Sequence, residues 1–115
     1  MNVVTLIGNL ATDVELKDIA GDKQVANFLL AVNRRTPEGG ADFVRISVWD
    51  KQGEVCSRYL TKGKRVGIEG YLRSHSWEED GKTRRQVDVT ARSVQFLSPP
   101  SEEGGEVIPF EAAVA

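Results

Sequence analysis

Apolar and polar residues alternate with a period of two along most of the chain. The alternation covers residues 26–33, 43–49, 66–73 and 87–96. Successive side chains of a β-strand point to opposite faces, so this period predicts strands with one buried and one outward face. Residues 3–7 are apolar on both faces, which predicts a further strand that is covered from two sides.

Turn-forming residues separate these strand-like runs. They gather at residues 20–22, 37–40 and 79–82, where Gly occurs together with Asp, Pro or Glu. The last of these turns joins two alternating runs and therefore predicts an extended β-hairpin.

One segment, residues 54–60, has the spacing of a helix instead. Its apolar residues would share one helical face: Val55, Cys56, Tyr59 and Leu60. Gly63 follows where a left-handed C-terminal cap would fit. We therefore expect a short helix that places Cys56 and Tyr59 in the core.

The predicted order of elements narrows the fold class to a few all-β architectures. Three strands, a short helix and two or three further strands match the five-stranded OB-fold barrel, which has its helix between strands 3 and 4. A small β-sandwich fits the same pattern and stays open at this point. With 115 residues, 40% of them hydrophobic, the chain suits one small domain with one core.

The composition of the chain changes once, at Ser98. Residues 1–97 hold all 15 Lys and Arg and 13 of the 17 Asp and Glu, so this part carries a net charge of +2. Residues 98–115 contain four Glu and no base, hence −4, and their Pro and Gly offer nothing to pack. We expect them to form a disordered acidic tail. The overall charge of −2 therefore masks a mildly basic domain.

Few residues of the chain suit metal, thiol or acid-base chemistry. Cys56 and His75 are the single cysteine and histidine, so one chain cannot build a disulfide or a Cys/His metal cage. The acids form no metal-binding cluster of the kind that a small nuclease needs. We expect no cofactor, no metal and no enzymatic activity. Without an 18-residue apolar run or signal-peptide features, the sequence predicts a cytoplasmic protein with no membrane contact.

The outward face of residues 43–49 carries the first candidate binding residues. If the alternate residues Val44, Ile46 and Val48 point into the core, then the outward side chains are Phe43, Arg45 and Trp49. Exposed aromatic rings stack on unpaired bases of any sequence, and a guanidinium pairs with the neighbouring phosphate. A core role is the alternative for Phe43 taken singly, but the shared phase with Arg45 and Trp49 favours single-stranded nucleic acid.

Other aromatic and basic residues extend this candidate site. Tyr71 and Arg73 repeat the combination of an aromatic ring with an arginine on the outward face of a later strand. An outward tyrosine also suits a subunit contact. Trp77 lies on the hairpin, with two arginines across its turn, and two more precede the loop at residues 37–40. The further basic candidates are Arg34, Arg35, Arg84 and Arg85. For Arg34 and Arg35, a solvated charge pair is the alternative to phosphate binding.

These residues stand within a pattern that resembles the bacterial single-stranded DNA-binding protein (SSB) family, from Met1 to about Leu97. The resemblance is carried by residues 2–10 (Asn-Val-Val-Thr-Leu-Ile-Gly-Asn-Leu), 25–32 (Val-Ala-Asn-Phe-Leu-Leu-Ala-Val), 43–49 (Phe-Val-Arg-Ile-Ser-Val-Trp), 53–63, 66–72 and 89–97. It implies an OB-fold, base stacking at Phe43, Trp49 and Trp77, and a homotetramer built through the first strand and the outer faces of the sheet.

The resemblance also implies the function: sequence-independent binding and protection of single-stranded DNA in replication, recombination and repair, in bacterial cytoplasm at the nucleoid. The alternative is an OB-fold protein–protein adaptor of a replication-restart complex that binds nucleic acid secondarily.

Two segments depart from the family pattern. The loop at residues 36–40 is short and lacks an aromatic residue that some members carry there. The acidic tip of the family ends in Ile-Pro-Phe, and its partners hold the terminal carboxylate. Here Ile108, Pro109 and Phe110 are followed by five more residues. Recruitment of replication and repair proteins through these three residues therefore stands as a hypothesis beside a coincidental Pro-Phe.

Overall fold

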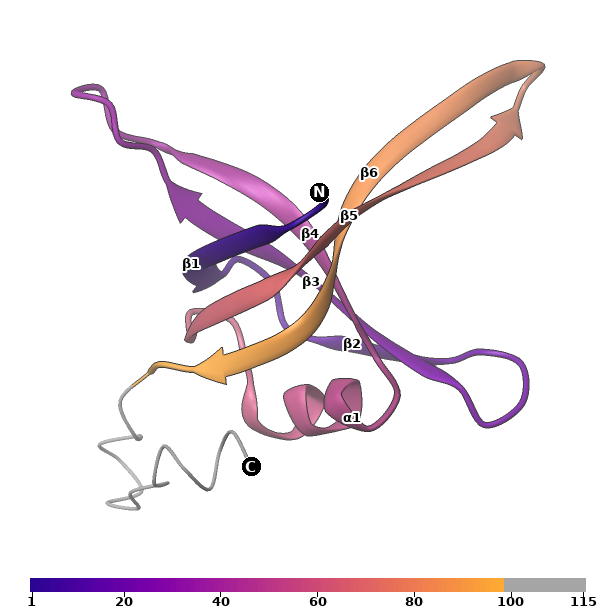
Figure 1. Cartoon of the computed structure of the whole chain (residues 1–115), viewed down its shortest axis with the longest axis horizontal. Coiled ribbons are helices and arrows are strands. Elements are labelled where there is room, and N and C mark those ends of the chain that lie inside the picture. The colour runs from indigo at the N-terminus through magenta and orange to yellow at the C-terminus, as the bar shows by residue number, and fades with distance from the viewer. Residues whose placement is uncertain (99–115) are drawn as a thin grey trace.

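The predicted strands join into one closed sheet in a computed structural model, which describes residues 1–98 (Figure 1). The elements are β1 (Val4–Leu10), β2 (Glu15–Asp18), β3 (Gln24–Asn33), β4 (Ala41–Trp49), α1 (Asp50–Tyr59), β5 (Arg65–Glu79) and β6 (Lys82–Phe96). β1 pairs with both β3 and β5, β5 pairs with β6, β6 pairs in parallel with β4, and β4 pairs with β3. This ring of five strands, with α1 between the third and fourth of them, confirms the OB-fold.

The first strand of the barrel is divided into β1 and β2, which the sequence pattern did not predict. Both pair with β3: Leu10 lies opposite Leu30, and Glu15 lies opposite Asn27. Every residue of β2 is exposed, so this short strand has no buried face that an alternating pattern could reveal. In the interruption, the Leu29 N–H donates a hydrogen bond to Thr12 Oγ1 at 3.1 Å.

The core fills the inside of the ring with the inward residues of the predicted runs. Its largest fully buried side chains are Leu30, Ile46, Val48, Val66, Val89 and Cys56. The prediction that residues 3–7 are covered from two sides is wrong for the single chain. Val3 and Ile7 are 62% and 55% exposed, because the sheet covers only the inward face of β1.

Helix α1 lies at the end of the barrel away from the N-terminus and packs on β2, β3 and β4 (Figure 1). It begins at Asp50, earlier than expected, and ends at Tyr59. Leu60 is extended, so Gly63, with φ +95°, belongs to the following turn and does not cap the helix. Cys56 is buried as predicted, but Tyr59 is 50% exposed and contacts Phe96 at the rim of the barrel, 6.2 Å between ring centroids.

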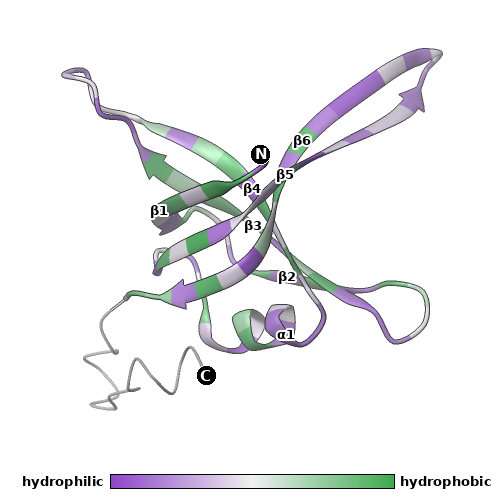
Figure 2. Ribbon diagram, viewed as in Figure 1, coloured by the Kyte–Doolittle hydropathy of each residue, from purple (hydrophilic) through white to green (hydrophobic). Residues whose placement is uncertain are grey.

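The β3–β4 and β5–β6 hairpins project from the barrel on the side of the N-terminus (Figure 1). The β5–β6 hairpin confirms the predicted extended arm, and its outer part is markedly hydrophilic (Figure 2). The arm begins at a bulge, where Glu69 pairs with Ser93 but Gly70 pairs with Ala91. Gly70 is required here, because a Cβ would collide with the backbone carbonyl of Thr90.

Candidate nucleic-acid interface

The outward face of β4 presents Phe43, Arg45 and Trp49 to solvent, as the alternation predicts. Phe43 is 64% exposed and Trp49 is 41% exposed, whereas Ile46 and Val48, the alternate residues of the strand, are buried in the core. In register on β3, Ala31 lies beside Phe43 and Leu29 lies beside Arg45. Large exposed rings on a regular strand are unusual for a face that has no partner, so this part of the sheet has the properties of a binding surface.

The outward face continues onto the β5–β6 arm through alternate residues of β5. Arg73, His75 and Trp77 share one face, since side chains two positions apart on a strand point the same way. Trp77 is 43% exposed and its Nε1–H donates to Glu79 Oε2 at 3.4 Å. As expected, β5 therefore places a third aromatic ring, that of Trp77, on the same face as Arg73.

Cross-strand register separates the two arginines of the arm. Arg84 lies opposite Trp77, and Arg85 lies opposite Ser76. Directly opposed residues of an antiparallel pair share a face, so Arg84 joins the face of Trp77 and Arg85 points to the other side. The sequence had grouped both with Trp77.

Tyr71 has a partner that the sequence interpretation missed. The Arg92 guanidinium carbon lies 4.9 Å from the centre of the Tyr71 ring, within cation–π distance. Arg92 is the extra residue of the β6 bulge, without a Cα partner on β5. A change of phase in the alternation, from Val89 and Ala91 to Val94 and Phe96, was the sequence signal that could have revealed it.

The structure does not bring Arg34 and Arg35 onto the aromatic face. Arg34 Nε lies 2.8 Å from Asp42 Oδ1 in an exposed ion pair. Arg35 borders a groove of about 460 Å³ on the outer side of β1, β5 and β6, together with Ile7 and Glu69. Asp42, the partner of Arg34, precedes Phe43 on β4 and therefore points to the other side of the strand. A phosphate-binding role for these two arginines stays a prediction.

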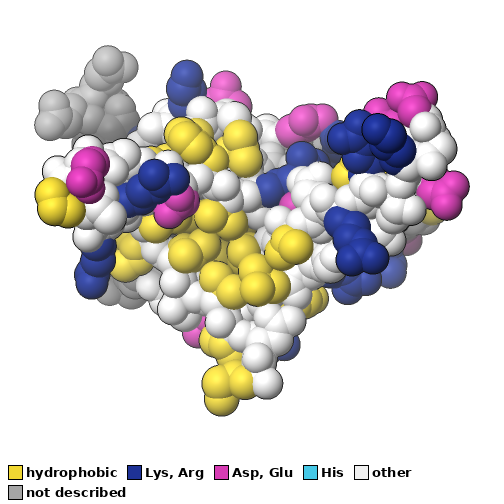
Figure 3. Space-filling model, turned by 90° about the horizontal axis from the view of Figure 1, so that it is seen from above, with side chains coloured by type: hydrophobic (Ala, Val, Ile, Leu, Met, Phe, Trp, Pro, Cys, Tyr) yellow, Lys and Arg dark blue, Asp and Glu magenta, His cyan; other side chains and the backbone are white. Residues whose placement is uncertain are grey.

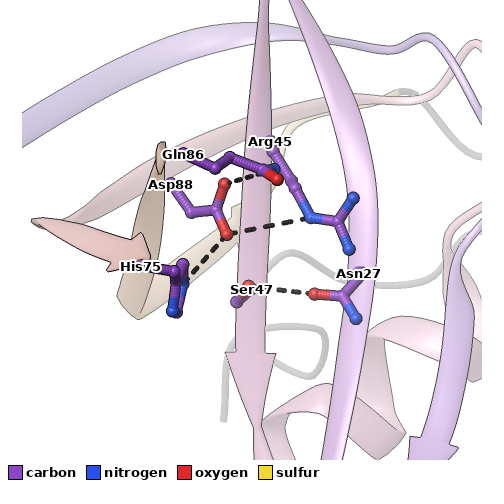
Figure 4. A network of polar contacts seen from close by, with 6 residues as sticks. All are labelled: Asn27, Arg45, Ser47, His75, Gln86 and Asp88. Atoms are coloured by element: carbon purple, nitrogen blue, oxygen red, sulfur yellow. Dashed lines mark hydrogen bonds and ion pairs between the residues drawn. The ribbon is translucent and has the colours of Figure 1, made fainter. Parts of the chain in front are cut away.

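A polar network centred on Asp88 lies between β4 and the arm (Figure 4). The Asp88 carboxylate contacts side chains from β4, β5 and β6: Arg45, His75 and Gln86. Beside it, the Ser47 hydroxyl donates to Asn27 Oδ1 at 2.9 Å. The sequence interpretation missed Asn27, Gln86 and Asp88 and gave His75 no partner, because the periodicity of a single strand does not show which side chains of other strands it meets.

We also looked for a metal site, a reactive thiol and a membrane-spanning helix in the part of the chain that the structure describes. Residues 1–98 contain no group of three or more His, Cys, Asp or Glu side chains placed to hold a metal ion. Burial raises the pKa of the Cys56 thiol to about 12, so this thiol is not a nucleophile near neutral pH. Within the same residues, no helix is long and apolar enough to cross a membrane.

The fold and this surface define an OB-fold protein with an exposed face of aromatic and basic residues. The chain belongs to the single-strand binding protein family, whose model matches residues 1–97. A "Single-stranded DNA-binding protein" of Treponema pallidum is 41% identical over 102 residues, covering 84% of this chain and 58% of the relative. "Single-stranded DNA-binding protein 3" of Clostridium acetobutylicum is 45% identical over 102 residues, covering 84% of this chain and 71% of the relative. A Bacillus cereus protein with the first of these names is 41% identical over 111 residues, covering 92% and 65%.

Proposed function

We propose that this protein binds single-stranded DNA without sequence preference and keeps it unpaired and protected, without catalysing a reaction. The observation that carries the proposal is the alignment of three exposed rings, Phe43, Trp49 and Trp77, with arginines on one continuous face. Every base has a π-face, so stacking on such rings is tolerant of sequence, and alanine substitution of one ring typically costs roughly 1–3 kcal/mol per base.

The modest charge of the domain fits single strands better than duplex DNA. Residues 1–97 carry a net charge of +2, so a duplex coat that relies on many phosphate contacts is not favoured. The names of the bacterial relatives agree with this interpretation. Roles in replication, recombination and repair, and a location in the cytoplasm with the chromosome, follow as parts of the same proposal.

Fluorescence titration with oligo-dT tests the proposal directly, because both tryptophans of the chain lie on the proposed face. We expect strong quenching at submicromolar strand and little change with a duplex of equal length. Absence of quenching would contradict the proposal and favour the protein–protein adaptor instead.

A pair of matched variants makes this test specific for the aromatic face. Phe43→Ala removes an exposed ring from β4, and Tyr59→Ala removes an exposed ring from α1, outside the proposed face. Phe43→Ala should weaken oligo-dT binding about 5- to 150-fold, the equivalent of roughly 1–3 kcal/mol. Tyr59→Ala should bind like the unchanged protein. Equal losses in both variants would mean that the effect comes from stability and not from stacking.

We further propose that four copies of the chain assemble into a homotetramer. Seen from the side of the two hairpins, hydrophobic side chains gather on the surface between them (Figure 3). Apolar side chains that are exposed in the single chain include Val3, just before β1, Ile7 on β1, and Leu72 and Val87 at the base of the arm. Contact with other copies would cover β1 from its second side, which is what its doubly apolar pattern predicts.

Light scattering tests the assembly. We expect a particle of four times the chain mass, and we expect Ile7→Glu to give smaller species, since it puts a charge on the exposed face of β1. Thr5→Glu is not a suitable control because it lies on the same face, so Lys62→Glu, in the turn after α1, serves instead. A monomeric unchanged protein would contradict the proposal.

The proposed recruitment of partner proteins through Ile108, Pro109 and Phe110 rests on sequence alone, as these residues lie outside the described part of the chain. The acidic tail predicted for residues 98–115 has the same standing, except that Ser98 still donates a backbone hydrogen bond to the Arg65 carbonyl at 3.1 Å.

A further inference from the structure

A buried carboxylate lies in the middle of the surface that we propose for a polyanion. Asp88 is only 5% exposed, and in register it faces Arg73 across the β5–β6 pair. A negative charge beside a phosphate path is unfavourable by Coulomb's law, and burial of a charge is costly unless it is paired. We therefore look for a benefit of the Asp88 carboxylate that outweighs both energetic costs.

The contacts of Asp88 use both carboxylate oxygens. Gln86 Nε2 donates a hydrogen bond to Oδ1 at 2.9 Å. His75 Nε2 lies 3.1 Å from Oδ2, and Arg45 Nε lies 3.8 Å from the same oxygen (Figure 4). The carboxylate thus joins β4 of the barrel wall to β5 of the arm through two side chains that are themselves about half exposed.

This geometry leaves the outer part of each side chain available. A guanidinium carries five N–H donors in a fixed fork, so an arginine that faces a carboxylate through Nε still presents its two terminal nitrogens. Within the described residues 1–98, the ion pair of Arg45 is the one with Asp88. His75 is paired with the same carboxylate through Nε2, and this contact ties Asp88 to β5 of the arm.

The position of the two side chains relates them to the stacking rings. Arg45 is two residues from Phe43 on β4, and His75 is two residues from Trp77 on β5. Both pairs share their strand's outward face. Asp88 therefore lies at the junction of the β4 rings and the ring on the arm.

We propose that Asp88 is a positioning residue that holds Arg45 in place for the phosphodiester backbone of a single strand, between a base stacked on Phe43 and a base stacked on Trp77, while its contact with His75 joins this arginine to the arm. The proposal rests on the single-strand binding proposed above. Side chains that are ordered before binding lose less conformational entropy when the strand arrives. The benefit of Asp88 therefore comes from order, at the cost of one negative charge near the DNA.

The sign of the effect of Asp88→Asn tests this inference. Removal of a negative charge from a DNA-binding surface should by itself tighten binding, so loss of binding requires the positioning role. We expect Asp88→Asn to weaken oligo-dT binding by about 5- to 10-fold. The matched control is Asp42→Asn, which removes an equal charge from an exposed ion pair on β4 and should bind as tightly as the unchanged protein or more tightly.

Salt dependence separates positioning from a general loss of structure. Each phosphate contact with a single strand contributes about 0.7 to the slope of log K against log salt. Asp88→Asn should lower the slope by about this amount, as should Arg45→Met, and the double variant should lose little more than either. Tighter binding or an unchanged slope in a folded Asp88→Asn protein would overturn the inference, while quenching of the unchanged protein by oligo-dT would leave the proposed function standing.

A second variant covers the case in which Asp88→Asn does not fold. Arg45→Lys keeps the charge at an exposed site but replaces the fork by a single ammonium group, which cannot face the carboxylate and a phosphate in the same way. We expect several-fold weaker binding with the fold intact by circular dichroism. Binding equal to that of the unchanged protein would overturn the inference.

Discussion

Phe43 and Trp49 are exposed because they occupy alternate positions on a strand whose other face fills the barrel. Ile46 and Val48 anchor the strand in the core, and the same alternation places the rings outside. The backbone of the strand is already fixed and an aromatic side chain has only two rotatable angles, so a ring in this position can stack on a base at low entropic cost. In the proposed function, these exposed rings let the protein distinguish unpaired bases from a duplex, whose bases are already stacked.

Trp49→Ala should weaken the binding of single strands of any base composition by a similar amount, roughly 1–3 kcal/mol. The reason is that stacking uses the π-face that all bases share. Titration with oligo-dT, oligo-dC and oligo-dA at one salt concentration measures it. A loss confined to one base would show that Trp49 acts through base-specific hydrogen bonds.

Cys56 gives a pH prediction at the same scale. Its pKa is raised by burial from 9.0 to about 12, so the thiol stays neutral in the native protein while the unfolded chain ionises above pH 9.0. The contribution of Cys56 to the free energy of unfolding is therefore constant below pH 9.0 and falls between pH 9.0 and about 12, by at most about 1.4 kcal/mol per pH unit.

Denaturant titrations of the unchanged protein and of Cys56→Ala at several pH values isolate this contribution, since the variant should lack the additional decline. A thiol reagent at pH 8 should react only after unfolding. Rapid modification of the native protein would contradict the burial of Cys56.

At the scale of elements, two irregularities shape the barrel and the arm. The interruption between β1 and β2 lets the first strand bend around the barrel, and the bulge opposite Gly70 marks the start of the arm. Each leaves backbone groups that regular pairing would satisfy. In the interruption, the hydroxyl of Thr12 accepts the hydrogen bond from the Leu29 N–H.

Thr12→Val should therefore destabilise the protein, because it preserves the shape of the side chain but leaves the partly buried Leu29 N–H without its acceptor. A lost partner of this kind costs about 1–3 kcal/mol. Thr12→Ser keeps the hydroxyl and should cost much less. Thermal or denaturant unfolding measures both variants, and equal stability of Thr12→Val and the unchanged protein would show that water replaces the hydroxyl.

At the scale of the whole molecule, binding combines rings with only a few charges. The arginines on the proposed face are Arg45, Arg73, Arg84 and Arg92. Four phosphate contacts predict a slope of log K against log salt of about −3 per chain, at about 0.7 for each contact with a single strand.

Titrations at several sodium chloride concentrations check this slope. Trp49→Ala is the informative comparison, because it should lower the affinity at every salt concentration and leave the slope unchanged. A slope several times steeper would mean that charge dominates and that the rings have a smaller role than we propose.

The sequence predicted the parts of this molecule that repeat locally. Alternation is a property of neighbouring residues, so it located the long strands and the outward position of Phe43, Arg45 and Trp49. It failed where a residue's environment depends on distant parts of the chain. Tyr59 has the spacing of a core residue but lies at the rim, and β2 has no buried face to mark it.

By itself the sequence pattern narrowed the fold to a few all-β architectures, and the family resemblance singled out the OB-fold. The pattern also determined the arm and the aromatic face, because the period of two settles which side of each strand enters the core. Only the tertiary structure decided which polar groups meet. The register of the β5–β6 hairpin brings His75 to Asp88, and ring closure through the parallel β4–β6 pair brings Arg45, far away in the sequence, to the same carboxylate. The reason is physical: strand periodicity comes from backbone geometry, whereas contacts between strands come from the global packing of the barrel.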